Sequence, residues 1–288
     1  MRPRDVAIAL CPPLMWGFAF ALAKPAAEHF PPIFMMAMAY GLCVVFTFPL
    51  LRGVKTPLWA VLAIGALGGA IQSSLLFLGL RDLPASTAVV VLQSQVPLAV
   101  VLSSLMGDER LSPRRLLGIA VAIGGIVVIA GAPDAVGSWS ALWLVILGGL
   151  SWAAAQAMIR HYGRDQGPAV TAFIAIVSAP LCLAASFALE SGRMESIAGA
   201  QPIEWASFAG LVLGGLSIPY FIWYGLLRRF RVDQVMPFVL LMPVIGVAAS
   251  GIFLGEPMGV SLLVGGAAVV AGLALVVLTP AKAAPARA

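Results

Sequence analysis

Long apolar segments run through almost the whole chain and limit what it can form. Read between charged residues and Pro/Gly breaks, ten such segments cover residues 6–23, 33–51, 58–80, 84–106, 115–131, 139–159, 169–189, 205–227, 234–254 and 258–278. A helix of about 20 residues, rising ~1.5 Å per residue, crosses the ~30 Å hydrocarbon core of a bilayer. The segments lack the alternation of barrel strands, and backbone polar groups in lipid must be paired within each span. The sequence therefore predicts ten transmembrane helices.

Composition supports a membrane protein without a soluble domain. Hydrophobic residues make up 61% of the 288 residues, and charged residues only 10%. A soluble domain carries about a quarter charged residues, so most of this surface is expected to face lipid. The breaks between spans are short, and residues 280–288 are expected to be a disordered tail.

The basic residues predict an orientation with both termini in the cytoplasm. With the N-terminus inside, only Lys24, Arg81 and Arg193 of the 17 basic residues fall outside. The cytoplasmic segments hold the other 14, which are Arg2, Arg4, Arg52, Lys55, Arg110, Arg114, Arg115, Arg160, Arg164, Arg228, Arg229, Arg231, Lys282 and Arg287. This bias follows the positive-inside rule and predicts a bacterial inner-membrane protein. The net charge of +5 belongs to this topology and does not indicate nucleic-acid binding, because the basic residues are scattered at helix ends.

Two halves of the chain share a pattern of glycines, which predicts an internal repeat. Gly68-Gly69 with Gly79 is echoed by Gly214-Gly215 with Gly225 at an offset of 146. Glu109, Gly118 and Gly125 are echoed by Glu256, Gly265 and Gly272 at an offset of 147, and Trp16 pairs with Trp152 at 136. The predicted halves are residues 1–132 and 139–279. Since each holds five helices, the second inserts inverted with respect to the first, as in transporters that work by alternating access.

Two prolines lie in the middle of spans at equivalent places in the repeat. Pro97 and Pro243 are 146 residues apart. Proline removes a backbone hydrogen bond and kinks a helix. Proline is also simply tolerated in membrane helices, but the pairing favours a gating or hinge role for these two.

Several short motifs recur at matching places in the two halves. The first half contains Leu92-Gln93-Ser94-Gln95-Val96-Pro97, Gly107-Asp108-Glu109-Arg110-Leu111 and Gly118-Ile119-Ala120. The second half contains the segment from Pro237 to Gly246 and Gly255-Glu256, and the first and sixth spans contain Trp16-Gly17 and Ser151-Trp152-Ala153. These motifs resemble the drug/metabolite transporter superfamily, in its EamA-type branch. Within the branch the chain is similar to exporters of cysteine and O-acetylserine, and more loosely to exporters of aromatic amino acids. The resemblance implies ten helices, both termini inside, and a central cavity lined by helices 1, 3, 4, 6, 8 and 9.

Neutral polar and aromatic side chains are the candidate substrate-binding residues. They are Trp16, Gln72, Gln93, Gln95, Trp152, Gln156, Tyr220 and Tyr224. Amides both donate and accept hydrogen bonds, and aromatic faces attract an ammonium group, so the set suits a zwitterion. Each glutamine taken singly could instead make a packing hydrogen bond between helices.

Charge and cysteine placement argue against an enzyme or a metal site. No ionisable residue falls securely in the middle of a span, whereas a membrane enzyme would need a buried acid–base pair or a metal cluster. The cysteines Cys11, Cys43 and Cys182 have no CxxC spacing. No cofactor, metal or catalytic residue is expected.

The sequence thus predicts an exporter of amino acids or related small metabolites with a neutral, partly aromatic cavity. The alternative is an exporter of hydrophobic or cationic drugs from the same superfamily. A small-multidrug-type proton antiporter needs a buried carboxylate, which the spans lack. The coupling mode is either proton coupling or facilitated diffusion, and the oligomeric state is either a monomer or a homodimer. The sequence leaves both alternatives open.

Overall fold

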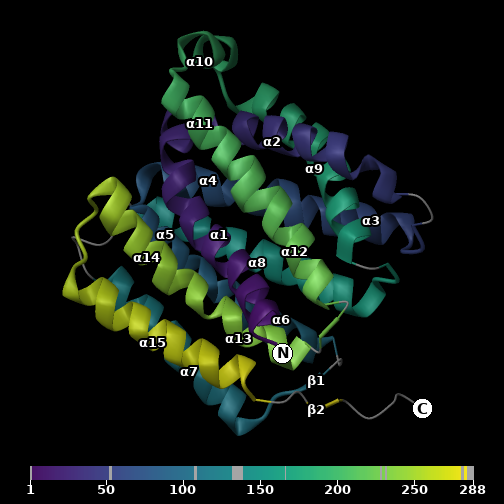
Figure 1. The fold of residues 1–288 in the computed structure, drawn as a ribbon, viewed down its shortest axis with the longest axis vertical. Coiled ribbons are helices and arrows are strands. Elements are labelled where there is room, and N and C mark those ends of the chain that lie inside the picture. Colours follow the sequence, from purple (N-terminus) through teal and green to yellow (C-terminus); the bar gives the residue numbers. More distant parts are fainter. Residues whose placement is uncertain are drawn as a thin grey trace.

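The computed structural model describes residues 2–51, 54–106, 109–131, 139–165, 167–227, 229–230, 232–279 and 282–283, and this part is almost entirely helical (Figure 1). The first half comprises α1 (Pro3–His29), α2 (Pro32–Thr47), η1 (Phe48–Leu51), α3 (Leu58–Gly65), η2 (Ala66–Ile71), α4 (Gln72–Asp82), α5 (Ala85–Val91), η3 (Leu92–Ser94), α6 (Gln95–Leu105), β1 (Glu109–Arg110) and α7 (Pro113–Ala130). The second half comprises α8 (Trp139–Tyr162), α9 (Gly167–Leu189), α10 (Arg193–Gly199), α11 (Pro202–Gly210), η4 (Leu211–Ser217), α12 (Ile218–Leu227), α13 (Val232–Val239), α14 (Leu241–Leu254), α15 (Val260–Val277) and β2 (Lys282–Ala283).

The predicted helical membrane class is confirmed. Within the described residues, nine helical segments are long and apolar enough to cross a membrane. The remaining predicted span, 33–51, corresponds to the shorter helix α2, which continues into the 3-10 turn η1. The first helix extends well beyond the predicted 6–23, from Pro3 to His29.

The short helix α10 and the strand pair β1 and β2 were not predicted. The short helix α10 lies in the connection between α9 and α11. Lys282 and Ala283, from the tail expected to be disordered, pair antiparallel with Arg110 and Glu109. The other residues of 280–288 lie outside the described part of the chain. The start of α1 and the strand β2 lie toward the same end of the bundle (Figure 1).

Two spans are widened by π-helical turns at equivalent positions. The third span runs through α3, η2 and α4, and the eighth through α11, η4 and α12. Both η2 and η4 are π-helical and contain the Gly-Gly pairs found in the sequence, which are 146 residues apart. At Gly69 the close approach of α9 requires glycine, because a Cβ atom there would overlap the side chain of Ser178. Such turns leave carbonyls free for other partners and are frequent at functional sites.

The fourth and ninth spans are also interrupted at equivalent places. The fourth is broken by the 3-10 turn η3, and the ninth by a turn at Leu240 between α13 and α14. Pro97 and Pro243 each stand at the third position of the helix that follows, α6 and α14. Proline suits the first turn of a helix, where its missing N–H leaves no hydrogen bond unmade within the helix. The prolines therefore mark where the second segment of each span begins.

Glycines on α7 and α15 bring these two helices into close backbone contact. Cβ atoms at Gly118 and Gly125 would lie 2.7 and 2.5 Å from the carbonyl oxygens of Gly272 and Gly265. Small residues permit such approach in membrane helices. This glycine face is therefore used for packing within the chain.

Candidate substrate cavity

A cavity of about 1040 Å³ lies between the two halves of the chain. All six helices implied by the family resemblance contribute to its lining, and α2, α9 and α15 add residues as well. The volume is at the upper end of the range of about 300–1,000 Å³ that is usual for small-molecule sites. It is large enough for an amino acid or a somewhat larger metabolite.

Seven of the eight candidate binding residues line this cavity. They are Trp16, Gln72, Gln93, Gln95, Trp152, Gln156 and Tyr220. Tyr224 belongs to α12, but its side chain lies outside the described part of the structure. Residues from the first, third and fourth spans and from the sixth and eighth spans thus meet at one place.

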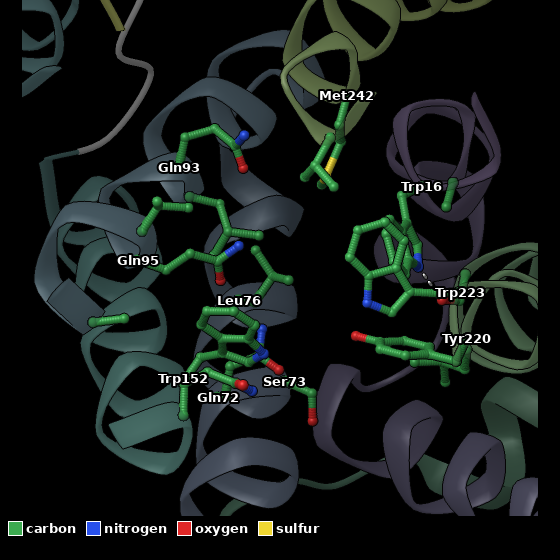
Figure 2. A pocket seen from close by; sticks show the side chains of 18 of the residues that line it. Trp16, Gln72, Ser73, Leu76, Gln93, Gln95, Trp152, Tyr220, Trp223 and Met242 are labelled. Atoms are coloured by element: carbon green, nitrogen blue, oxygen red, sulfur yellow. Dashed lines mark hydrogen bonds between the residues drawn. The ribbon is translucent and has the colours of Figure 1, made fainter. Parts of the chain in front are cut away.

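One side of the cavity carries Gln72, Gln93, Gln95 and Trp152 (Figure 2). We call these residues, together with Gln156, which lines the cavity and follows Trp152 by one helical turn, the amide wall. Gln93 is almost fully buried, at 2% exposure, although its amide lies at the cavity. The buried Oε1 atom of Gln95 has no hydrogen-bond partner among the described residues. An unpaired buried carbonyl is costly, so this atom is available to a hydrogen-bond donor in the cavity.

The opposite side is formed by Trp16, Tyr220 and Trp223, which we call the aromatic wall (Figure 2). The ring of Trp16 meets Tyr220 and Trp223 edge-to-face, with centroid distances of 5.1 and 5.7 Å. Its Nε1–H donates to the carbonyl oxygen of Gly215 in η4, at 3.2 Å. The π-helical turn leaves this carbonyl available, and the indole that uses it is thereby fixed in orientation.

The sequence did not single out Tyr40 and Trp223, two aromatic cavity residues that carry a polar atom. Tyr40 on α2 lines it and is hydrogen-bonded to Ser73 on α4. No sequence signal pointed to Tyr40, because the resemblance implied no role for the second helix. Trp223 could have been found, since it lies three residues after Tyr220 and therefore on the same helix face.

The two gating candidates lie behind the cavity surface. Pro97 and Pro243 are both buried. Their neighbours Val96 and Met242 line the cavity. A change of angle at either proline would therefore move a residue of the cavity lining, although neither proline lines it.

One end of the cavity reaches the surface. Arg160 and Met236 both line it and are exposed, and Asp165 lies nearby in the connection between α8 and α9. Asp165 accepts hydrogen bonds from the backbone N–H groups of Lys55 and Thr56 and from Thr56 Oγ1. Partial desolvation raises the pKa of Asp165, but these hydrogen bonds outweigh it and hold the pKa below its ordinary value.

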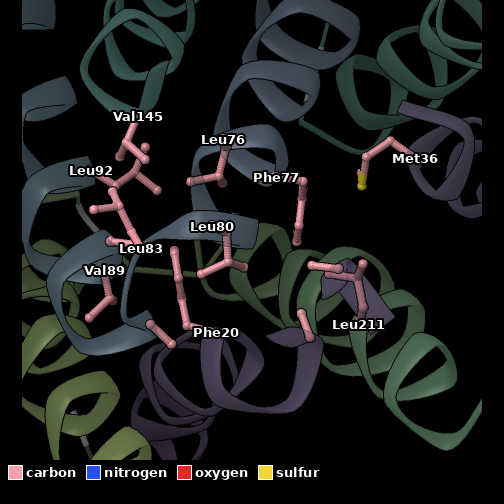
Figure 3. Close-up of a cluster of buried hydrophobic side chains, with 14 of the residues drawn as sticks. Phe20, Met36, Leu76, Phe77, Leu80, Leu83, Val89, Leu92, Val145 and Leu211 are labelled. Atoms are coloured by element: carbon pink, nitrogen blue, oxygen red, sulfur yellow. The ribbon is translucent and has the colours of Figure 1, made fainter. Parts of the chain in front are cut away.

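The other end is closed by buried apolar side chains. Phe20, Leu76, Phe77, Leu80 and Leu211 line the cavity there and continue into the hydrophobic core (Figure 3). Leu80 is completely buried. The cavity is therefore open toward one side of the bundle and sealed toward the other.

Charge enters the cavity only at its open end. Among the lining residues that are described, Arg160 and Asp165 are the only charged ones. No cluster of His, Cys, Asp and Glu that could hold a metal ion occurs in the described residues. The arrangement suits reversible binding of a small polar or zwitterionic molecule.

The sequence matches the EamA-like transporter family twice, over residues 5–131 and again over residues 139–278. The chain belongs to the EamA-like transporter family. It is therefore a multi-pass membrane transporter and not an enzyme.

Curated relatives match over nearly their whole length. The chain is 27% identical to a probable amino-acid metabolite efflux pump of Salmonella typhimurium, covering 95% of this chain and 94% of the relative. It is 26% identical to a protein of the same description from Escherichia coli, covering 89% of each. A solved crystal structure with 22% identity covers 96% of both chains with a TM-score of 0.63, which supports the fold.

Proposed function

We propose that this protein exports amino acids or related small metabolites by alternating access through the central cavity. The observation that carries the proposal is the pairing of the amide wall, with its unpartnered Gln95 Oε1, with an aromatic wall across the same cavity. The descriptions of the Salmonella and Escherichia relatives as probable amino-acid metabolite efflux pumps support the same class of substrate.

The two walls match the two kinds of group in an amino acid. Amide oxygens of Gln72, Gln93 and Gln95 accept from the ammonium group, and amide NH₂ groups, including that of Gln156, donate to the carboxylate. The faces of Trp16 and Trp152 attract the ammonium or stack on a side chain. Tyr220 completes the aromatic side, and Tyr224 remains a candidate from the sequence. Binding without a fixed charge is weak, which suits the release of a substrate that is abundant inside the cell.

The proposed architecture has ten spans in two inverted five-helix halves, residues 1–132 and 139–279, with both termini in the cytoplasm of a bacterium. The equivalent π-helical turns η2 and η4, and the equivalent breaks before Pro97 and Pro243, support the repeat. In this orientation the open end of the cavity, at Arg160, faces the cytoplasm. Pro97 and Pro243 act as hinges when the cavity closes there and opens to the outside.

Export of hydrophobic or cationic drugs is the second candidate. The aromatic wall and the many apolar lining residues favour it. Since no carboxylate lies deep in the described cavity lining, a cation would have to be held by aromatic faces and amide oxygens alone. Competition between an amino acid and a hydrophobic cation for the same protein distinguishes the two.

Purified protein in liposomes preloaded with labelled amino acids tests the proposal. We expect release of at least one amino acid, faster than from protein-free liposomes. A pH gradient across the liposome membrane distinguishes proton coupling from facilitated diffusion. Release at the same rate with and without the gradient indicates facilitated diffusion. Absence of release for every amino acid, together with release of a hydrophobic cation, would overturn the amino-acid assignment.

A further inference from the structure

The turn between α4 and α5 lies over the closed end of the cavity. Leu80, in the last turn of α4, and Leu83, the residue that follows α4, are buried at 0% and 1% exposure. Both belong to the apolar cluster that seals this end (Figure 3). Leu80 also lines the cavity. Any pathway to the outside at this end must displace the α4–α5 turn.

A carboxylate from the second half holds one side of this turn. Glu256, in the connection between α14 and α15, accepts from the backbone N–H groups of Ala85 and Ser86 at 2.6 and 2.9 Å. It also accepts from Ser86 Oγ at 2.5 Å. These N–H groups begin α5 and have no partner within the helix. An anion at a helix N-terminus is favourable both as a hydrogen-bond acceptor and toward the helix dipole.

An ammonium group from α1 holds the other side. Lys24 Nζ donates to the carbonyl oxygens of Leu80, Arg81 and Leu83, at 2.7, 3.0 and 2.8 Å. These carbonyls end α4, where a cation is favoured. Lys24 also pairs with the exposed Glu28 at 3.2 Å. The turn is thus held by a positive charge at the end of one helix and a negative charge at the start of the next.

The internal repeat supplies a counterpart for each part of this arrangement. Arg160 follows Trp152 by eight residues, as Lys24 follows Trp16. Gly225-Leu226 at the end of α12 correspond to Gly79-Leu80, and Val232, which begins α13, corresponds to Ala85. Glu109 corresponds to Glu256, and its side chain lies outside the described residues. Of these counterparts, Arg160 lines the cavity at its open end.

We propose that Lys24 and Glu256 form a clasp that keeps the α4–α5 turn closed over one end of the cavity. Arg160 holds the end of α12 in the corresponding way when the other end closes. Transport then releases the clasp and engages Arg160 in its place. This inference rests on the alternating access proposed above, and it assigns positioning roles to three charged residues outside the binding walls.

Accessibility of a reporter cysteine tests the clasp without any substrate. In a background with Cys11, Cys43 and Cys182 replaced by alanine, Leu80→Cys places a thiol at the closed end while keeping the carbonyl that Lys24 contacts. A membrane-impermeant maleimide is applied to intact cells, from the outside. We expect Lys24→Met and Glu256→Gln each to increase the labelling rate by about tenfold, since each removes charged hydrogen bonds present only in the closed state.

Glu190→Gln is the matched control. Glu190 accepts from the backbone N–H groups of Ile33 and Phe34 and so holds the start of α2, not of α5, in the same manner. We expect it to leave the labelling rate unchanged. Arg160→Met should act in the opposite direction and reduce labelling, because it weakens the state that is open to the outside.

The clasp is wrong if neither Lys24→Met nor Glu256→Gln changes labelling, or if Glu190→Gln increases it equally. The reporter requires no transported molecule. Failure of amino-acid release from liposomes would therefore leave the labelling result standing, and an unchanged labelling rate would leave the substrate assignment standing.

Discussion

The π-helical turns η2 and η4 lie in equivalent spans, yet their carbonyls are used differently. In the third span, Ser151 on α8 donates to Leu67 O at 2.7 Å, and Ser73, one turn further along the same span, donates to Gly69 O at 2.6 Å. Ser73 lines the cavity and Ser151 does not. In the eighth span, Gly215 O accepts from Trp16, which belongs to another span and is part of the aromatic wall. Serines thus satisfy these carbonyls of η2 and leave the amides of the amide wall unused, whereas η4 engages the indole of the aromatic wall.

This difference separates a wall that is open to new hydrogen bonds from one that is already occupied. On the amide wall, Gln95 Oε1 stays without a partner among the described residues. On the aromatic wall, the indole N–H of Trp16 is engaged by Gly215 O, so Trp16 offers only its ring surface. Specific hydrogen bonding to substrate should therefore depend on the amide wall, and non-specific contact on the aromatic wall.

The largest expected effect comes from removing the unpartnered amide. Gln95→Leu should reduce amino-acid release from liposomes by about tenfold or more, because a buried hydrogen bond to a charged group contributes about 1.5–3 kcal/mol. The thermal unfolding temperature should not be lowered, since Gln95 Oε1 makes no hydrogen bond within the described structure that the variant could lose. If Gln95→Leu released amino acids at an undiminished rate, the proposal that the amide wall binds substrate would be wrong.

The difference in packing between the two π-helical turns can be tested with alanine. A Cβ atom at Gly69 would overlap Ser178, whereas at the equivalent Gly215 the nearest atom is the flexible Cδ1 end of Leu211, at 3.2 Å. Gly69→Ala should destabilise the protein by about 1–3 kcal/mol through overpacking. Gly215→Ala should cost less than about 1 kcal/mol, because the Leu211 side chain can shift.

Thermal unfolding in detergent compares the two variants directly. Equal losses of stability in both would contradict the assignment of tighter packing to η2. Gly214→Ala is a useful third measurement, since nothing lies within 4 Å of a Cβ atom there.

A smaller effect is expected when only the hydrogen bond of Trp16 is lost. Trp16→Phe keeps an aromatic ring beside Tyr220 and Trp223 but leaves Gly215 O without its donor. We expect a loss of about 1 kcal/mol in unfolding free energy and a modest decrease in transport. Trp223→Phe is the control, because no hydrogen bond is described for Trp223. An identical loss in both variants would show that the ring, and not the hydrogen bond, supplies the stability.

Much of this arrangement could be anticipated from the sequence, and the rest depends on packing between distant segments. The glutamines and Trp152 could be chosen because they are polar or aromatic on spans assigned to the cavity, and they do meet there. Their roles in binding stay predictions. The π-helical turns could be located by their Gly-Gly pairs but not recognised, because helical periodicity does not distinguish one added residue in a turn. Tyr40 was missed because its place in the lining depends on how α2 packs.

The smallest effect is expected where the third span is anchored at the mouth of the cavity. Asp165 holds Lys55 and Thr56, just before α3, through two backbone bonds of 2.8 Å. Because its pKa is lowered in the folded protein, its contribution is present above the ordinary Asp pKa of about 3.9 and is lost as the pH falls through the folded value. Asp165→Asn should therefore cost less than about 1 kcal/mol at neutral pH, the usual limit at an exposed site. The unfolding temperatures of the original protein and of Asp165→Asn should converge as the pH falls below about 4. A difference that stays constant with pH would mean that the carboxylate charge does not hold this span.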